Sequence, residues 1–370
     1  MWAMIVKEFR QLRRDRRTLA MMIVLPVLLL VVFGYAASFD VKSIPTVVAG
    51  PQAQDLPLPA PFHVVARAPG EGVAWAQDQL RDNRDGAALA VVTGARTVVL
   101  VDGSQLFTAR DALTALAARS RPRPAGQAPA VRILYNPQLK TSYIMIPGLA
   151  GVVLAFIGII ITSLGVVRER QTGTLEQLAV MPLHPRDVFL GKIVPYFAVA
   201  CVDLAIVLAV GVALFGVPFR GSYAVFGLGA LLFLFVTLGL GVLISSVSEN
   251  QGQAIQLSFM FTLPQVLLSG LIFPLTSIAA GVRWISYILP LTYFNEISRG
   301  VMLRAEPISG LWQPLLFLAL LGLVVMSLAM LRFRGFLSPA GTGGRRGGRP
   351  AAATAVAAAV PAGPDPAGTR

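Results

Sequence analysis

The chain has 370 residues, of which 55% are hydrophobic and only 13% are charged. Soluble domains carry about 25% charged residues, so this composition excludes an ordinary soluble protein and indicates an integral membrane protein. The formal net charge of +13 would also suit a nucleic-acid-binding protein. The basic residues, however, flank apolar runs and form no face interleaved with stacking aromatics, so we expect no nucleic acid partner. The single cysteine, Cys201, excludes a disulfide framework within the chain.

Residues 1–18 are expected to form a cytoplasmic amphipathic connecting helix. Apolar residues recur there at helical spacing and basic residues occupy most of the other side, a pattern typical of helices that lie in the membrane interface. Residues 19–37 form the first apolar run long enough to span a bilayer, which takes about 20 residues. Because a signal-peptide core has about 7–15 residues, an uncleaved anchor is favoured over a cleaved signal.

Residues 38–143 form the one sizeable hydrophilic block before the tail, and they predict a small α/β domain. Short apolar stretches indicate strands at 46–49, 62–66, 87–92 and 97–101, and helices are expected at 73–81 and 107–118. A block of about 100 residues is large enough for one hydrophobic core. Residues 121–124, Arg-Pro-Arg-Pro, read as a linker before the chain returns to the membrane.

Residues 144–335 contain the remaining apolar runs, which predict transmembrane helices at 144–167, 193–217, 223–247, 254–275 and 312–331. Pro264 and Gly270 interrupt the fourth of these, a break that requires neighbouring groups to satisfy the freed backbone. Residues 276–310 are too apolar for a free loop, and their aromatics predict one or two short helices in the outer leaflet. Residues 336–370 predict a disordered cytoplasmic tail, because Gly, Ala, Pro and Arg without aromatics cannot form a packed core.

The basic residues set the expected topology. Lys and Arg accumulate on cytoplasmic loops, and here they cluster before the first run, between the second and third, and after the last. Both termini are therefore expected in the cytoplasm, with basic clusters also placed to contact membrane lipid. The expected fold class is an α-helical polytopic membrane protein with six transmembrane helices and an extracytoplasmic α/β domain inserted between helices 1 and 2.

The loop at 168–192 is the most informative stretch, because it is charged, turn-forming and held between two apolar runs on the basic side. Gly173 and Thr174 permit a turn, and Thr174 is a candidate N-cap for a short helix that Pro182 ends. A rigid turn and short helix of this kind can transmit force from a soluble partner. The alternative is that the loop is a plain polar connector between two spans. The expected contact residues are Arg168, Glu169, Arg170, Gly173, Thr174, Leu175, Glu176, Gln177, Leu178 and Pro182.

The chain lacks the phosphate-binding loop of an ATPase. Ile193 follows Gly191 and Lys192 where that loop requires Ser or Thr, so we expect no ATP hydrolysis by this chain alone. His63 and His184 fall on opposite sides of the membrane in the expected topology, so neither a metal site nor a Ser/His/Asp triad is expected, and no catalytic residue is assigned.

Five residues inside the apolar runs are candidates for a substrate path. Asp203 is an intramembrane carboxylate, and burying such a group is costly enough that function is the default interpretation; the alternative is a protonated Asp203 or one bonded to a neighbouring helix. Phe156, Met260, Phe261 and Gln265 are candidate cavity liners, since Met and aromatic side chains adapt to varied apolar ligands. Core packing or contact with lipid is the alternative for each.

Taken in order, the motifs of residues 1–335 resemble the permease subunit of an ABC-2 type exporter, close to the bacterial drug-efflux branch. The 168–192 loop carries the Arg-Glu-Arg triplet, the Gly-Thr-Leu-Glu-Gln-Leu core at 173–178, Pro182, and Leu-Gly-Lys leading to Pro195. The sequences at 268–270, 273–274 and 289–293 resemble the closing segment of that family. Ile278 and Ala279 depart from it, because the family often has Met-Pro there.

The resemblance implies a permease that moves a hydrophobic or amphipathic substrate (drug, lipid or metabolite) out across the cytoplasmic inner membrane of a bacterium. It implies a separate ABC ATP-binding subunit, which holds ATP and Mg and presses on the 168–192 loop, and a second permease as a homodimer or sister chain. The sequence does not decide whether a periplasmic adaptor protein is also a partner. The alternatives are a membrane-anchored assembly protein and an ion-driven secondary transporter, the latter disfavoured because matched broken helices are not evident.

Overall fold

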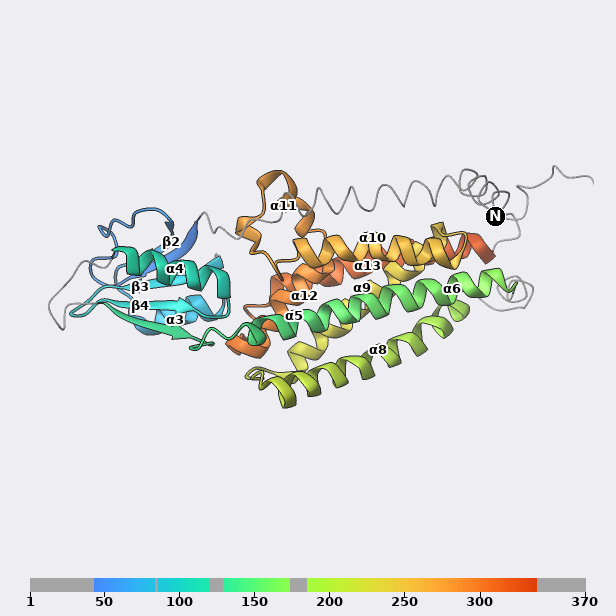
Figure 1. The fold of residues 1–370 in the computed structure, drawn as a ribbon, viewed down its shortest axis with the longest axis horizontal. Helices are drawn as coiled ribbons and strands as arrows, with labels where there is room; N and C mark the ends of the chain where they lie inside the picture. The colour runs from blue at the N-terminus through green and yellow to red at the C-terminus, as the bar shows by residue number, and fades with distance from the viewer. Residues whose placement is uncertain (1–42, 84–85, 120–128, 174–184, 338–370) are drawn as a thin grey trace, which may run out of the picture.

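The computed structural model describes residues 43–83, 86–119, 129–173 and 185–337, and it places an α/β domain at one end of a bundle of long helices (Figure 1). The expected helix at 1–18, the first span at 19–37 and nearly all of the tail lie outside these residues. The part of the 168–192 loop from 174 to 184 also lies outside them.

The α/β domain is built on a five-stranded mixed sheet with the order β2-β1-β3-β4-β5. The strands are β1 (Ile44–Ala49), β2 (Phe62–Ala68), β3 (Leu89–Val92), β4 (Val98–Asp102) and β5 (Ala130–Leu134). The β3–β4 pair is antiparallel and the other pairs are parallel. All four residues of β3 are buried, as expected of a strand that is covered on both faces.

Two helices cover the opposite faces of this sheet. Leu80 of α3 (Val73–Arg81) packs with Leu100 on one side, and Ala112 of α4 (Leu106–Arg119) packs with Val101 on the other. The four expected strands and both expected helices are therefore present. Strand β5 was not expected: it pairs only with β4, and two of its five residues are exposed, so it lacks the apolar run that marks its neighbours.

Four described helices are long and apolar enough to cross a membrane. They are Thr141–Gln171, Val194–Phe215 within α8 (Pro185–Phe215), α9 (Tyr223–Val247), and Trp312–Arg332 within α13 (Trp312–Leu337). The first is continuous through α5 (Thr141–Phe156), the π-helical η2 (Ile157–Ile161) and α6 (Thr162–Gln171). Each overlaps an expected span, and α9 has the expected bounds.

The expected span at 254–275 differs from the structure. Helix α10 (Gln251–Leu268) passes through Pro264 without ending, and the chain turns at Gly270, whose φ of +78° suits glycine best. Several Gln, Ser and Thr residues make α10 too polar to join the four membrane-spanning candidates. With the first span undescribed and α10 shorter than expected, a total of six membrane crossings stays a prediction.

One or two short helices were expected at 276–310, and the structure has four short helical elements there. They are η3 (Leu275–Ser277), α11 (Ala280–Ser286), α12 (Pro290–Arg299) and the π-helical η4 (Gly300–Arg304). Helix α12 is packed into the bundle, where Phe294 stacks on Phe233 of α9 with ring centroids 4.6 Å apart. Helix α11 projects from the bundle (Figure 1) and Trp284 on it is exposed, which suits the membrane–water interface.

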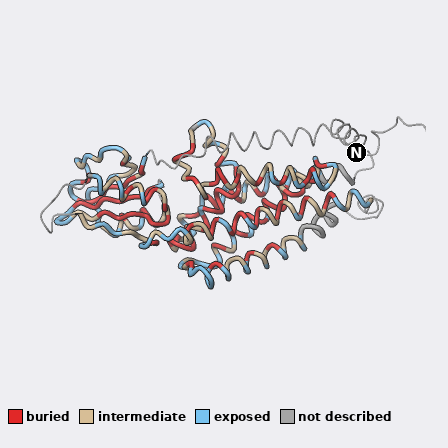
Figure 2. Tube along the Cα trace, in the orientation of Figure 1, coloured by how far each residue is buried: buried red, intermediate tan, exposed pale blue. Residues whose placement is uncertain are grey.

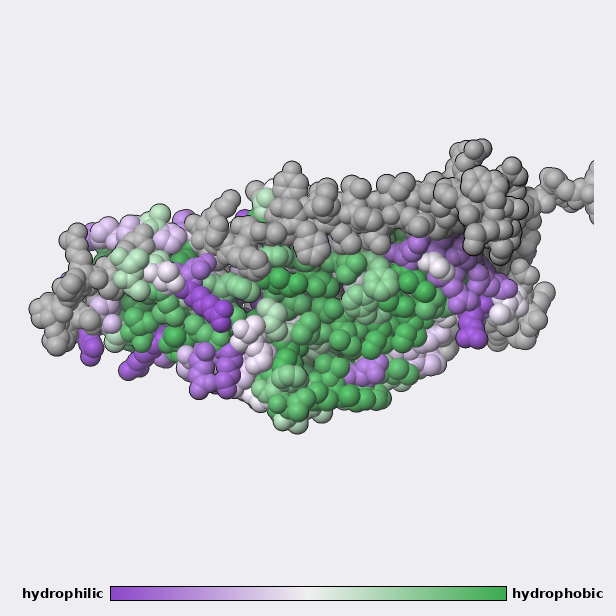
Figure 3. All heavy atoms as spheres, in the orientation of Figure 1, coloured by the Kyte–Doolittle hydropathy of each residue, from purple (hydrophilic) through white to green (hydrophobic). Residues whose placement is uncertain are grey.

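Burial and hydropathy divide the molecule into three zones. Buried residues fill the middle of the sheet and the interior of the helix bundle (Figure 2). The bundle surface is broadly apolar, between the more polar α/β domain and a polar patch at the far end (Figure 3). On α8, Val202 is 59% and Leu214 73% exposed, so this helix requires lipid or another apolar surface beside it.

Candidate functional site

The start of the expected contact loop lies at the end of the bundle that is remote from the α/β domain (Figure 1). The Thr172 hydroxyl donates hydrogen bonds to the carbonyls of Arg168 (3.1 Å) and Glu169 (3.2 Å), and Gly173 follows with φ +75°. These features end α6 in a tight turn. The roles expected of Thr174, Leu175, Glu176, Gln177, Leu178 and Pro182 lie outside the described residues and stay predictions.

Contacts tie this turn to the connection between α9 and α10. Gln251 Nε2 donates to Gln171 Oε1 at 3.0 Å, and Arg170 Nη1 lies 3.5 Å from the Ser245 carbonyl. Gln251 opens α10, and its neighbour Asn250 caps that helix by accepting from the Gln253 amide at 2.9 Å. A displacement of the loop would therefore move the end of α6 and the start of α10 together.

Four of the five substrate-path candidates lie on two helices that pack together, α5 and α10. Phe156 of α5 meets Phe259 of α10 edge to face at 5.5 Å, and Met260, Phe261 and Gln265 also lie on α10. Met260 and Phe261 are half-buried and Gln265 is fully buried.

Asp203 stands apart from this group. It lies half-buried on α8, which packs against α5, α9 and α13. Within the described chain it is therefore not gathered with the α10 residues.

Buried polar side chains also lie between α6 and α10. The hydroxyls of Ser163 and Ser258 lie 3.2 Å apart. Beyond them, Thr262 Oγ1 and both terminal atoms of Gln265 are buried without a hydrogen-bond partner among the described residues.

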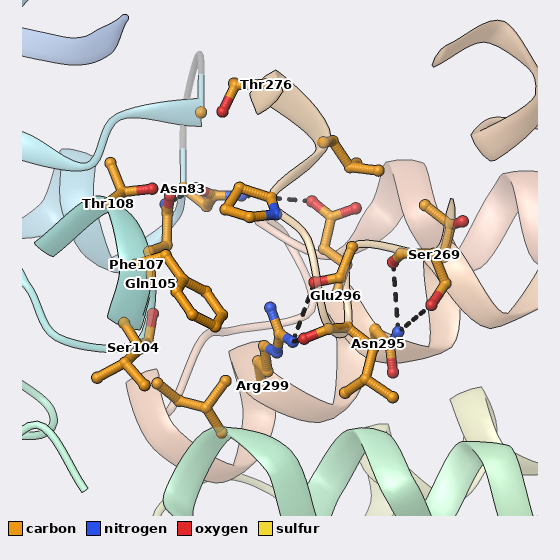
Figure 4. Close-up of a pocket in the computed structure, with 18 of the residues that line it drawn as sticks. Asn83, Ser104, Gln105, Phe107, Thr108, Ser269, Thr276, Asn295, Glu296 and Arg299 are labelled. Atoms are coloured by element: carbon orange, nitrogen blue, oxygen red, sulfur yellow. Dashed lines mark hydrogen bonds between the residues drawn. The ribbon is translucent and has the colours of Figure 1, made fainter. Parts of the chain in front are cut away.

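A cavity of about 230 Å³ lies where the α/β domain meets α10 and α12. Its polar lining includes Asn83, Ser104, Gln105, Thr108, Ser269, Thr276, Thr292, Asn295, Glu296, Arg299 and Arg304, and its apolar lining includes Leu106, Phe107, Ile144, Leu271, Pro274 and Leu275. Figure 4 shows Gln105 and Phe107 of the α/β domain facing Asn295 and Glu296 of α12 across this space.

Buried charges surround one wall of this cavity. Arg304 and Glu306 pair at 2.6 Å with side chains only 4% and 2% exposed. Arg304 also donates to the Ser104 hydroxyl at 3.2 Å. Burial raises the pKa of the Asp102 carboxyl, an effect that nearby Arg304 and the backbone amide of Ser104 partly oppose. Burial likewise raises the pKa of Glu306, partly opposed by Arg304.

The comparisons with known proteins place these features in a family. The sequence model of the family described as ABC-2 family transporter protein matches residues 82–331, more than half of the chain. The chain belongs to the ABC-2 transporter family. It is 34% identical over 214 residues, 58% of each chain, to the probable multidrug ABC transporter permease YbhR of Escherichia coli K12. It is 29% identical over 339 residues to the probable multidrug ABC transporter permease YbhS of the same organism, which covers 82% of this chain and 88% of that relative.

A third relative is the inner membrane transport permease YhhJ of Escherichia coli K12, 31% identical over 207 residues. In the YbhR and YhhJ alignments the chain spans little more than half the length of the relative, 58% and 54%. These matches and the apolar helices show a polytopic helical membrane protein of the ABC-2 family. The resemblance drawn from the sequence motifs is thereby confirmed.

In this ABC-2 family protein, the sequence patterns did not predict the cavity beside the α/β domain. Its lining comes from three distant stretches of the chain, which no local pattern connects. One signal was available: Glu296 and Arg299 are charged residues three positions apart in an otherwise apolar, aromatic segment. That spacing puts both on one face of a helix.

Proposed function

We propose that this chain is the membrane subunit of an ATP-driven exporter, moving a hydrophobic or amphipathic substrate out across the cytoplasmic membrane. One observation carries the proposal: basic residues lie at one end of the helix bundle and the α/β domain lies at the other. Arg168, Arg170 and Arg332 lie at the ends of α6 and of the α13 span, and the α/β domain lies at the opposite end (Figure 1). Basic residues accumulate on the cytoplasmic side, so the α/β domain would face outward.

The chain would receive its energy from a separate ATP-binding subunit that docks on the 168–192 loop. The Gln171–Gln251 hydrogen bond supports this role, because it joins the loop to α10, the helix that carries most of the substrate-path candidates. Closure of the ATP-binding subunits would favour one arrangement of α6 and α10 over another. A second permease, identical or related, would cover apolar surface such as that of α8, which is exposed at Val202 and Ile206.

Labelling with a membrane-impermeant maleimide tests the orientation. The native thiol is removed by Cys201→Ser, and single cysteines are introduced by Asp55→Cys in the α/β domain and Gln171→Cys at the end of α6; both positions are exposed. We expect Asp55→Cys to be labelled in right-side-out spheroplasts, and Gln171→Cys only after the membrane is permeabilised. Labelling of Gln171→Cys in sealed spheroplasts would refute the proposal.

A further inference from the structure

The cavity between the α/β domain and α12 is large enough for a ligand, and its charges define which one. We propose that it binds the head of a zwitterionic amphiphile, with a cationic amine beside Glu296 and an acidic group beside Arg299. This site is separate from the 168–192 loop and from the residues suggested for the substrate path. The inference does not depend on the direction of transport or on the ATP-binding subunit.

Glu296 and Arg299 both line the cavity from one face of α12 (Figure 4). Glu296 is exposed and Arg299 is half-buried, and both side chains face this space. The two side chains do not form an ion pair with each other, and no other described residue pairs with either of them in that way, whereas Arg304 and Glu306 nearby pair at 2.6 Å. Two opposite charges thus face one cavity without neutralising each other.

The hydrogen bonds of these two side chains are weak or incomplete. Glu296 Oε1 accepts from Asn83 Nδ2 at a long 3.4 Å. Arg299 Nη2 donates to the carbonyls of Gly270 (3.1 Å) and Leu271 (3.3 Å), while its Nε is buried without an acceptor among the described residues. An unpaired charge is costly where it is buried, as Arg299 Nε is, and the exposed Glu296 carboxylate remains open to a cationic partner. A ligand that brings one group of each sign would satisfy both.

The two opposite charges favour a ligand that carries both an amine and an acid over simpler ligands. A simple anion at Arg299 would leave the Glu296 carboxylate beside a second negative charge, and a simple cation at Glu296 would leave Arg299 unpaired. Charge-assisted hydrogen bonds to carboxylate or phosphate are the strongest that a guanidinium makes, and an ammonium complements a carboxylate in the same way. A molecule with both groups therefore fits this cavity best.

The size and apolar lining argue for a head group that carries an apolar chain. Water occupies about 30 Å³ per molecule, so the cavity of about 230 Å³ holds a group of head-group size. Phe107, Pro274 and Leu275 line it together with the polar side chains, so a purely polar solute would leave this apolar surface unused. A zwitterionic lipid and a zwitterionic transported molecule share this chemistry.

Binding to the purified full-length protein in a maltoside detergent tests the proposal. The probes are dihexanoyl phosphatidylethanolamine, which has both charges, dihexanoyl phosphatidic acid, which lacks the amine, and hexylamine, which lacks the acid. We expect the first to bind about tenfold more tightly than either of the others, since each lacks one charge-assisted contact. Phosphoethanolamine without acyl chains should bind more weakly than the lipid. Equal affinity for the lipid and the single-charge probes would overturn the zwitterion, and equal affinity for the chain-free head group would overturn the amphiphile.

Two substitutions assign the charges. Glu296→Gln should abolish the preference over phosphatidic acid, and Arg299→Gln should abolish the preference over hexylamine. The matched controls are Glu71→Gln and Arg96→Gln, exposed residues of the α/β domain away from the cavity lining, which should bind like the unmodified protein. Unchanged preferences in both cavity variants would place the site elsewhere.

A third variant guards against misfolding. Thr276→Trp fills the cavity without removing a charge, and it should abolish binding of all three probes while the protein elutes as a single species in gel filtration. Retained binding would show that the ligand binds outside this cavity.

Analysis of the lipids that copurify with the protein distinguishes the two sources of ligand. A zwitterionic lipid enriched in the unmodified protein and lost in Glu296→Gln identifies a membrane lipid, and probe binding without such enrichment identifies a transported molecule.

Discussion

Arg304 and Ser104 are 200 positions apart in the chain, yet Arg304 Nη1 lies 3.2 Å from the Ser104 hydroxyl. Ser104 follows β4 of the α/β domain, and Arg304 ends η4 in the helix bundle. Because Arg304 also pairs with Glu306, a single guanidinium joins the domain to the bundle through charged and polar contacts. The α/β domain is therefore fixed to the helices by groups that are sensitive to substitution and to pH.

Replacing Arg304 by Met should destabilise this junction strongly. The change leaves the buried carboxylate of Glu306 without its cation, and breaking a buried ion pair by removing one partner costs about 3–5 kcal/mol. Chemical unfolding of the purified protein in detergent, followed by tryptophan fluorescence, measures the loss. Arg220→Ala is the control, because Arg220 is exposed and such changes usually stay within about 0.5 kcal/mol. Equal losses in the two variants would show that the Arg304 contacts do not stabilise the junction.

The junction should also make stability depend on pH in an unusual direction. Burial raises the pKa of both Asp102 and Glu306. A carboxyl whose pKa is higher in the folded state binds more protons there than when unfolded, so the free energy of unfolding falls as pH rises through the folded-state pKa. We therefore expect a higher melting temperature at pH 5 than at pH 7.5. Asp102→Asn should reduce this difference, and a melting temperature that rises with pH in the unmodified protein would contradict the assignment.

The sequence predicted the long helices well because their signal is local. An apolar run such as that of α9 can be satisfied only as a buried or membrane helix, and its predicted bounds match the structure. Strands β1, β3 and β4 were found for the same reason, since they are buried on both faces and read as continuous apolar runs. Strand β5 was missed because Val131 and Arg132 are exposed at the edge of the sheet.

The cavity could not be predicted in the same way. Asn83, Ser104, Ser269 and Glu296 come together there only through the docking of the α/β domain on α12. No periodicity in a single stretch encodes such contacts. Helix α10 begins and ends earlier than expected, because Asn250 caps its start and the chain turns at Gly270.

Gly151 should tolerate no side chain, because α12 packs closely on α5. A Cβ there would lie 2.5 Å from the Phe294 ring, which is fully buried. Overpacking a core in this way costs about 1–3 kcal/mol, and the helix preference for alanine offsets about 1 kcal/mol of it, so Gly151→Ala should lower the free energy of unfolding by up to about 2 kcal/mol. Gly227→Ala in α9 is the matched control: nothing lies within 4 Å of the added carbon, and alanine is favoured over glycine in a helix by about 0.8–1.0 kcal/mol. If Gly151→Ala proves as stable as Gly227→Ala, the packing of α12 on α5 is looser than described.

The 168–192 loop should control ATP-driven transport without controlling membrane insertion. If an ATP-binding subunit presses on this loop, Glu169→Ala and Glu176→Ala should each lower nucleotide-stimulated transport in proteoliposomes by about tenfold, the effect of losing about 1.4 kcal/mol of coupling. Glu71→Ala, which alters an exposed carboxylate of the α/β domain, should transport normally. Gln251→Ala removes the hydrogen bond from α10 to Gln171 and should uncouple in part, with ATP hydrolysis retained and transport reduced. Normal transport by both glutamate variants would show that the 168–192 loop does not couple ATP hydrolysis to transport.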